Sequence, residues 1–178
     1  LIKAAFQMFV KNLRATDTVS IVTYGGFVQV WLHPTSGNEK TAILRSIEEL
    51  EAAGDTPGES AIRMAYQVAQ KAFIKGGNNR IILATDGDFN VGETTEKALD
   101  ELITKQRQSG VYLTCLGVGM GNFKDSKLQT LAKKGNGNYA YLDDISEAER
   151  VLVKELTQTF YAVADDVFMN VKFNPAMV

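Results

Sequence analysis

The chain alternates between segments whose apolar residues recur every three or four positions and shorter segments rich in β-branched and aromatic residues. The first pattern is typical of helices that bury one face, and the second is typical of strands. The patterns predict helices near 1–13, 36–54, 59–77, 94–108, 125–133 and 146–163, and strands near 17–26, 27–34, 79–85, 111–118 and 138–142. This order predicts an α/β fold with a doubly wound, mostly parallel sheet.

Three segments carry more detailed expectations. Segments 17–26 and 27–34 are separated only by glycines, which predicts a hairpin and places one antiparallel strand at a sheet edge. The continuous apolar run in 79–85 predicts a parallel strand that is covered on both faces. In the first helix the polar residues Lys3, Gln7 and Lys11 lie four apart and almost all other positions are apolar, so we expect that helix to be largely buried with one stripe facing water.

The two ends of the chain predict its domain organisation. The first helix opens without an N-cap residue, an initiator methionine or a preceding strand, so we expect a fragment of a longer protein or a missing beginning. The alternation in 166–175 predicts a strand that leads toward a following module. We therefore expect one domain over 1–164 and a C-terminal strand within 165–178.

Composition narrows the class of protein. The 178 residues are 45% hydrophobic and 22% charged with a net charge of −2, which describes a globular chain and favours neither nucleic acid nor an anionic membrane as a partner. No apolar run approaches the roughly 20 residues that span a bilayer, and no signal peptide opens the sequence.

Catalytic chemistry finds little support in the sequence. Cys115 is the single cysteine and lies in an apolar run, which favours core packing, and the lone His33 has no patterned partner. No Gly-x-x-x-x-Gly-Lys-Ser/Thr loop and no Gly-x-Ser-x-Gly elbow occurs. The glycines of 117–122 resemble a phosphate-binding loop, but they follow a late strand and lack the acidic partner of a dinucleotide site. We therefore expect no enzyme, with a metal-assisted hydrolase as the weaker alternative.

The most informative short motif stands where the strand 79–85 ends. Asp86, Gly87 and Asp88 follow directly, and ligands of open α/β sheets bind beyond the carboxyl ends of the strands. Carboxylate oxygens suit Mg²⁺, Mn²⁺ or Ca²⁺. The alternative is an ordinary Asp-Gly turn, and Asp88 could be a solvated turn residue.

A second loop, "AAGDTPGES" at 52–60, adds a hydroxyl. Thr56 precedes the helix from residue 59 and could reach the same crevice, whereas the alternative is that Thr56 or Ser60 only caps that helix. With the order of elements and "ATDG" at the strand end, the chain resembles the von Willebrand factor type A domain, and most closely its bacterial surface or periplasmic members.

The resemblance implies a metal-ion-dependent adhesion site. In the family this site combines an Asp-x-Ser-x-Ser loop after the first strand, a threonine from a second loop and an aspartate at a later strand end. Thr56 matches the threonine and Asp86 matches the aspartate, but the Asp-x-Ser-x-Ser loop and its strand are absent from this chain. We therefore expect weak or absent binding of Mg²⁺ or Mn²⁺, because water must supply most of a six-coordinate shell.

The same resemblance implies a gap in the sheet. The absent central strand belongs between 17–26 and 79–85, so its loss leaves two exposed edges, which pair directly or are completed by another chain. The first functional hypothesis is a protein-binding module whose cation is completed by a partner's acidic side chain. The alternative is a metal-independent scaffold, with Tyr139 and Tyr141 either on its surface or half-buried. A bacterial cell-envelope location rests on resemblance alone.

Overall fold

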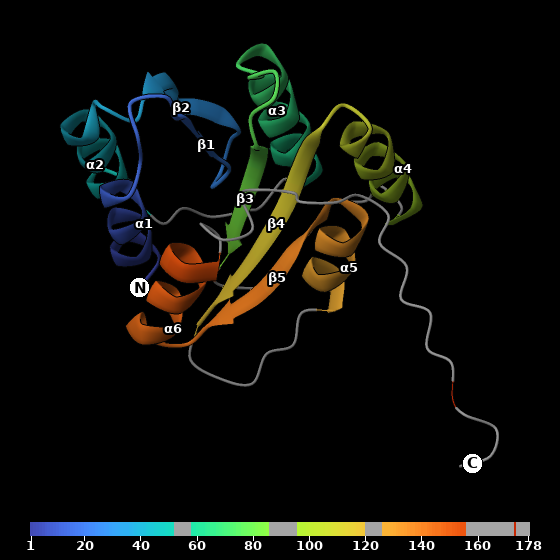
Figure 1. Cartoon of the computed structure of the whole chain (residues 1–178). Helices are drawn as coiled ribbons and strands as arrows, with labels where there is room; N and C mark the ends of the chain where they lie inside the picture. Colours follow the sequence, from blue (N-terminus) through green and yellow to red (C-terminus); the bar gives the residue numbers. More distant parts are fainter. Residues whose placement is uncertain (52–57, 86–95, 120–125, 156–172, 174–178) are drawn as a thin grey trace.

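The computed structural model describes residues 1–51, 58–85, 96–119, 126–155 and 173 (Figure 1). Helices and strands alternate along most of this part of the chain. In chain order they are α1 (Ile2–Lys11), β1 (Thr18–Thr23), β2 (Gln29–Ser36), α2 (Lys40–Glu48), α3 (Gly58–Lys71), β3 (Asn79–Thr85), α4 (Glu96–Arg107), β4 (Val111–Val118), α5 (Ser126–Lys134), β5 (Asn136–Leu142), α6 (Ile145–Glu149) and the π-helical turn η1 (Arg150–Glu155).

The described strands form two sheets. β1 and β2 pair antiparallel, with Val22 opposite Val30, whereas β3, β4 and β5 form a parallel sheet with β4 in the middle. Leu83 lies opposite Cys115 in the β3–β4 register. The predicted α/β class, the parallel sheet and the antiparallel hairpin are therefore confirmed.

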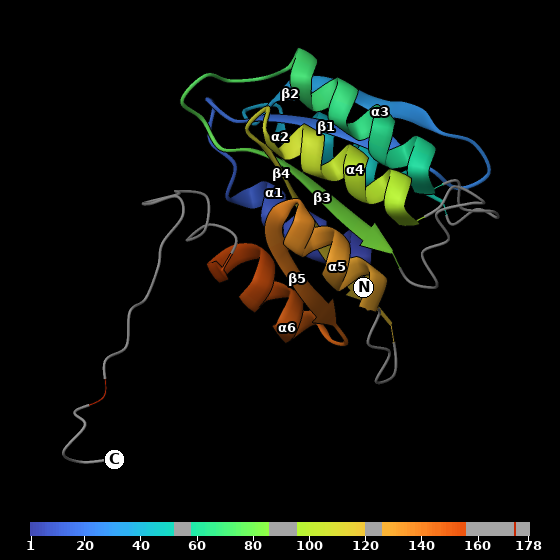
Figure 2. The same ribbon diagram turned by 90° about the vertical axis from the view of Figure 1, so that its right-hand side faces the viewer.

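Helices cover both faces of the strands. α3, α4 and α5 lie on one side, and α1, α2 and α6 lie on the other (Figures 1 and 2). The same division separates the side chains of β3, because Leu83 packs with Ile62 of α3 while Ile82 and Ala84 pack on the side of α1. This arrangement of two helical layers around a parallel sheet is the doubly wound architecture.

The centre of the core is β4 rather than β3. Five of the eight β4 residues from Val111 to Val118 are hydrophobic and buried, as follows from pairing on both edges and cover on both faces. In β3 only Leu83 and Thr85 are buried, and the other residues are half-buried. The prediction that 79–85 is a parallel strand covered on both faces is thus confirmed, and β3 pairs on one side only among the described residues.

Two helices bridge the two sheets. Phe6 of α1 packs against the cluster beneath β3 and β4 and also against the cluster beneath β1 and β2. On the opposite side α3 contacts β1 as well as β3. Only Ala5 and Val10 of α1 are fully buried, so that helix is less buried than its apolar sequence predicts.

The observed α3 differs in part from the helix predicted near 59–77. The apolar stripe extends to Phe73, but the helix ends at Lys71, and Phe73 is 42% exposed. Tyr66, which breaks the stripe in sequence, is instead completely buried. The predicted strand near 166–175 and the last turns of the helix predicted to end at 163 lie outside the described residues, apart from Phe173, which is exposed.

Candidate functional site

Both predicted metal ligands lie just beyond described elements. Thr56 lies outside the described residues, two positions before α3 begins at Gly58, and Asp86 lies outside them, one position after β3 ends at Thr85. Asp88 also lies outside the described part of the chain. What the structure describes at this site is therefore the set of residues that flank these two loops.

Packing between α3 and β3 places the ends of these elements together. Ile62, in the second turn of α3, and Tyr66 contact the same buried cluster as Leu83 of β3. Figure 2 shows that α3 begins at the end of the molecule at which β3 ends. The chain therefore leaves β3 and enters α3 on the same side, where the carboxyl ends of parallel strands form the usual ligand-binding edge of α/β proteins.

Thr85 is the last residue of β3 and lies at this edge of the sheet. It is 9% exposed and lies opposite Gly117 of β4. A methyl group at Gly117 would lie 3.0 Å from Cδ2 of Tyr141, and one at Gly119 would lie 3.2 Å from its hydroxyl. Tyr139 and Tyr141 are half-buried, as expected if they pack against the fold. Gly117 and Gly119 therefore leave space for the ring of Tyr141.

A second feature joins the two sheets at this edge. The hydroxyl of Tyr24, the first residue after β1, donates a hydrogen bond of 2.5 Å to the main-chain carbonyl of Ala84 in β3. Tyr24 lies inside the strand predicted over 17–26, and the local sequence pattern gives no sign of a side chain that reaches across the sheet. Thr23 Oγ1, beside it, is buried without a hydrogen-bond partner within the described structure.

The described residues do not assemble a nucleophilic site. Cys115 is fully buried, which agrees with core packing, and His33 is exposed on β2. Burial, with a smaller effect of Cys115, raises the pKa of the Tyr66 phenol well above its ordinary value of 10.0. Tyr66 therefore stays neutral and acts as core. No group of three or more His, Cys, Asp or Glu side chains that could hold a metal occurs within the described ranges.

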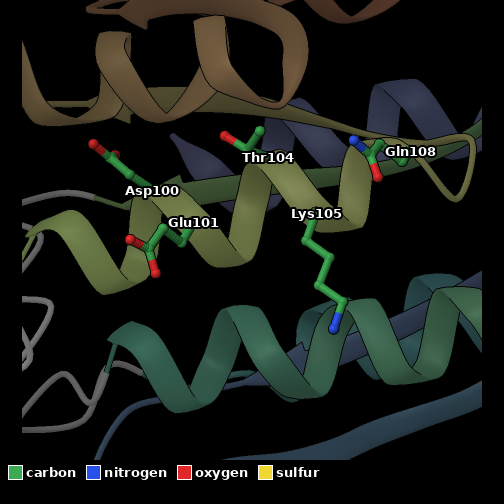
Figure 3. Close-up of a pocket in the computed structure, with 5 residues that line it drawn as sticks. All are labelled: Asp100, Glu101, Thr104, Lys105 and Gln108. Atoms are coloured by element: carbon green, nitrogen blue, oxygen red, sulfur yellow. The ribbon is translucent and has the colours of Figure 1, made fainter.

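A shallow hollow of 440 Å³ lies on α4 (Figure 3). Its lining residues come from that helix and the position just after it: Asp100, Glu101, Thr104, Lys105 and Gln108. Asp100 is paired with Lys134 of α5. With carboxylate, hydroxyl, amine and amide groups spread over three turns of one helix, the hollow lacks converging groups from separate elements and is not the candidate site.

The comparisons with known proteins agree with this architecture. The chain is 46% identical over 178 residues to the uncharacterized protein YfbK of Escherichia coli, and 26% identical to the inter-alpha-trypsin inhibitor heavy chain H2 of Mesocricetus auratus. The first match covers all of this chain but only 31% of YfbK. The second covers 96% of this chain but only 18% of the heavy chain. No described helix is long and apolar enough to cross a membrane.

Solved structures give the same fold. A von Willebrand factor type A protein from Catenulispora acidiphila matches with a TM-score of 0.70 at 18% identity, covering 88% of this chain and 36% of that one. Proximal thread matrix protein 1 of the mussel byssus, with a zinc-occupied MIDAS motif, matches with a TM-score of 0.65 at 22% identity, over 85% of this chain and 39% of that one. The family model of the von Willebrand factor type A domain matches residues 1–158, so the chain belongs to that family.

Proposed function

We propose that this chain is a protein-binding module that recognises an acidic side chain of its partner through a divalent cation. Thr56 and Asp86 each contribute an oxygen ligand, and the partner's Asp or Glu takes an open coordination position. Family membership supports this proposal. The observation that carries it is the meeting of the start of α3 and the end of β3 at one edge, because these elements lead into the two ligand loops.

The packing beneath the loops supports a pre-formed arrangement. Gly58 and Ile62 at the start of α3 are buried, as are Leu83 and Thr85 at the end of β3. Buried anchors of this kind hold a loop end better than exposed ones, because moving them exposes apolar surface. The described residues that flank the two loops, Gly58 and Thr85, are therefore held by packing on both elements.

The donor chemistry selects the class of cation. A hydroxyl and a carboxylate are hard oxygen ligands, which favour Mg²⁺ or Mn²⁺. The mussel protein has a zinc-occupied MIDAS motif, so Zn²⁺ belongs among the ions to be tested. Two protein ligands leave most of an octahedral shell to water, and we expect dissociation constants no tighter than about 10⁻⁴ M.

Calorimetric titration with Mg²⁺, Mn²⁺ and Zn²⁺ tests the proposal. Thr56→Ala/Asp86→Ala is the site variant. Asp143→Ala and Thr16→Ala are matched controls, because Asp143 is an exposed carboxylate just after β5 and Thr16 is an exposed threonine between α1 and β1. Saturable heat that is lost in the site variant and kept in both controls supports the site.

Two other outcomes separate the alternatives. If a partner captured by the chain binds equally well to the site variant and in the presence of a chelator, the chain is a metal-independent scaffold. Metal-dependent hydrolysis of a phosphate ester or ester substrate that Asp86→Ala abolishes would instead support the metal-assisted hydrolase. Cys115 is buried and His33 lies on β2, so neither of these two side chains supports the hydrolase alternative.

A further inference from the structure

The ends of α3 and α4 carry basic and apolar side chains far from the candidate cation site. α3 begins at the edge where β3 ends and runs away from it, and Figure 2 shows that α4 runs beside α3 and ends at the same far end of the molecule. The side chains of Gln70 and Gln106 join the last turns of the two helices by a hydrogen bond. We define the basic patch as the exposed residues Lys71, Phe73, Ile74, Lys75, Lys105 and Arg107.

The patch exposes two large, adjacent apolar side chains. Phe73 and Ile74 are each 42% exposed. A methyl group at Gly110 would lie 3.4 Å from the Phe73 ring, so this ring lies against the connection between α4 and β4. The Asn79 side chain accepts a hydrogen bond from the Ile74 N–H and donates one to the Ile74 carbonyl, both at 2.9 Å. The two apolar side chains are therefore held in place at the surface, where covering them would be favourable.

The four cations of the patch form no ion pair within the described ranges. Glu101 lies one turn before Lys105 on α4, and Figure 3 shows the Lys105 side chain extending toward α3. Cations in the last turn of a helix complement its dipole, which accounts for Lys71, Lys105 and Arg107. It accounts neither for Lys75, which lies beyond the end of α3, nor for the exposed apolar pair.

From these observations we propose that the basic patch binds an acidic polypeptide segment that places an apolar side chain between its carboxylates. Charge complementarity defines this partner, because the four cations attract carboxylates and the apolar pair is covered by an apolar side chain. An anionic membrane fits less well, since the whole chain carries a net charge of −2. More than half of each apolar side chain is also covered by the domain itself, so neither projects far into a bilayer.

A fluorescence-polarisation titration with a dye-labelled acidic peptide tests this inference, which does not depend on the cation site. The probe holds a central pair of phenylalanine and leucine between aspartates and glutamates. One control peptide replaces the apolar pair with serines, and the other replaces the acids with lysines. Lys71→Glu/Lys75→Glu and Phe73→Ser/Ile74→Ser should each weaken binding of the probe at least about tenfold, and both control peptides should bind the wild type more weakly by a similar factor.

Matched variants outside the patch control for charge and apolar exposure. Lys127→Glu/Lys154→Glu reverses two exposed lysines on α5 and η1, and Ile145→Ser removes an apolar side chain that is 45% exposed. Both should bind the probe as the wild type does, and circular dichroism should show that all variants remain folded. Raising the ionic strength from about 0.05 M to about 0.5 M should weaken binding several-fold, because salt screens exposed charges.

Carbodiimide cross-linking locates the bound peptide, because it joins a carboxylate to a nearby lysine amine. Mass spectrometry should find cross-links at Lys71, Lys75 or Lys105 and none at Lys127 or Lys154. Absent binding, binding that both patch variants retain, or cross-links only at the two control lysines overturns the inference.

Two further outcomes overturn the inference and identify another occupant of the patch. Co-sedimentation with phosphatidylglycerol vesicles, lost in the patch variants and without binding of the peptide, identifies a membrane surface. Dimers at higher protein concentration in sedimentation velocity, lost in the same variants and without binding of the peptide, identify a second copy of this chain.

Discussion

Tyr24→Phe removes a single atom from the contact that joins the two sheets. The hydroxyl lies 2.5 Å from the Ala84 carbonyl, and the aromatic ring packs against the cluster beneath α3, so the substitution keeps the packing and deletes only the hydrogen bond. Loss of such a bond lowers the free energy of unfolding by about 0.5–1.5 kcal/mol. With a urea slope of about 2 kcal/mol/M, the unfolding midpoint should fall by about 0.25–0.75 M.

Two signals follow the unfolding separately. Trp31 is the single tryptophan, and its indole N–H donates to the Ser46 carbonyl at 2.9 Å, so its fluorescence reports on β2 and α2. Circular dichroism reports on all helices. Because α1 and α3 pack against both sheets, we expect the two signals to change together in the wild type and in the variant.

Tyr141→Phe is the matched control, because it removes a hydroxyl from a half-buried tyrosine on β5, a strand that does not take part in the contact between the two sheets. Its midpoint should change less than that of Tyr24→Phe. An unchanged midpoint for Tyr24→Phe would refute the role of this bond. Fluorescence and dichroism transitions that separate in the wild type would refute the mechanical coupling of the two sheets.

Three further substitutions test local features of the structure. Burial raises the pKa of Asp17, but hydrogen bonds from Arg14 together lower this pKa more strongly and leave it below its ordinary value of 3.8. Asp17→Asn should therefore lower the urea midpoint at pH 7. The difference between variant and wild type should vanish as the pH falls through the lowered pKa of Asp17. Gly137→Ala places a methyl group against the Leu113 carbonyl. It should lower the free energy of unfolding by about 1–3 kcal/mol, measured by thermal unfolding. Tyr66→Phe removes a buried hydroxyl that has no partner within the described structure, and its melting temperature should equal or exceed that of the wild type; a decrease would reveal a hydrogen bond at that hydroxyl.

Element types were predictable because their periodicity is local. The run 111–118 predicts β4 with the observed bounds, and the short glycine-rich connection after 17–26 predicts the hairpin. Boundaries were less predictable. The apolar stripe of α3 continues past its last turn, so sequence spacing alone could not show that Phe73 is exposed.

Long-range pairing was predictable only through resemblance. The strand 79–85 has the composition of a strand covered on both faces, and nothing in its own sequence shows that it pairs on one side only among the described residues. Tyr24 could have been suspected as an isolated aromatic residue at a strand end, but its acceptor, Ala84, is 60 positions away. The metal ligands remain predictions, because Thr56 and Asp86 both lie outside the described residues.

The proposed function requires that Thr56 and Asp86 hold a cation with an open coordination position. Water proton relaxation in the presence of Mn²⁺ measures this directly, because bound Mn²⁺ that retains exchangeable water enhances relaxation. We expect an enhancement that acetate reduces by displacing water and that Thr56→Ala/Asp86→Ala abolishes, while Asp143→Ala preserves it. An absent enhancement, or one that the site variant retains, would rule out a cation site at these two residues.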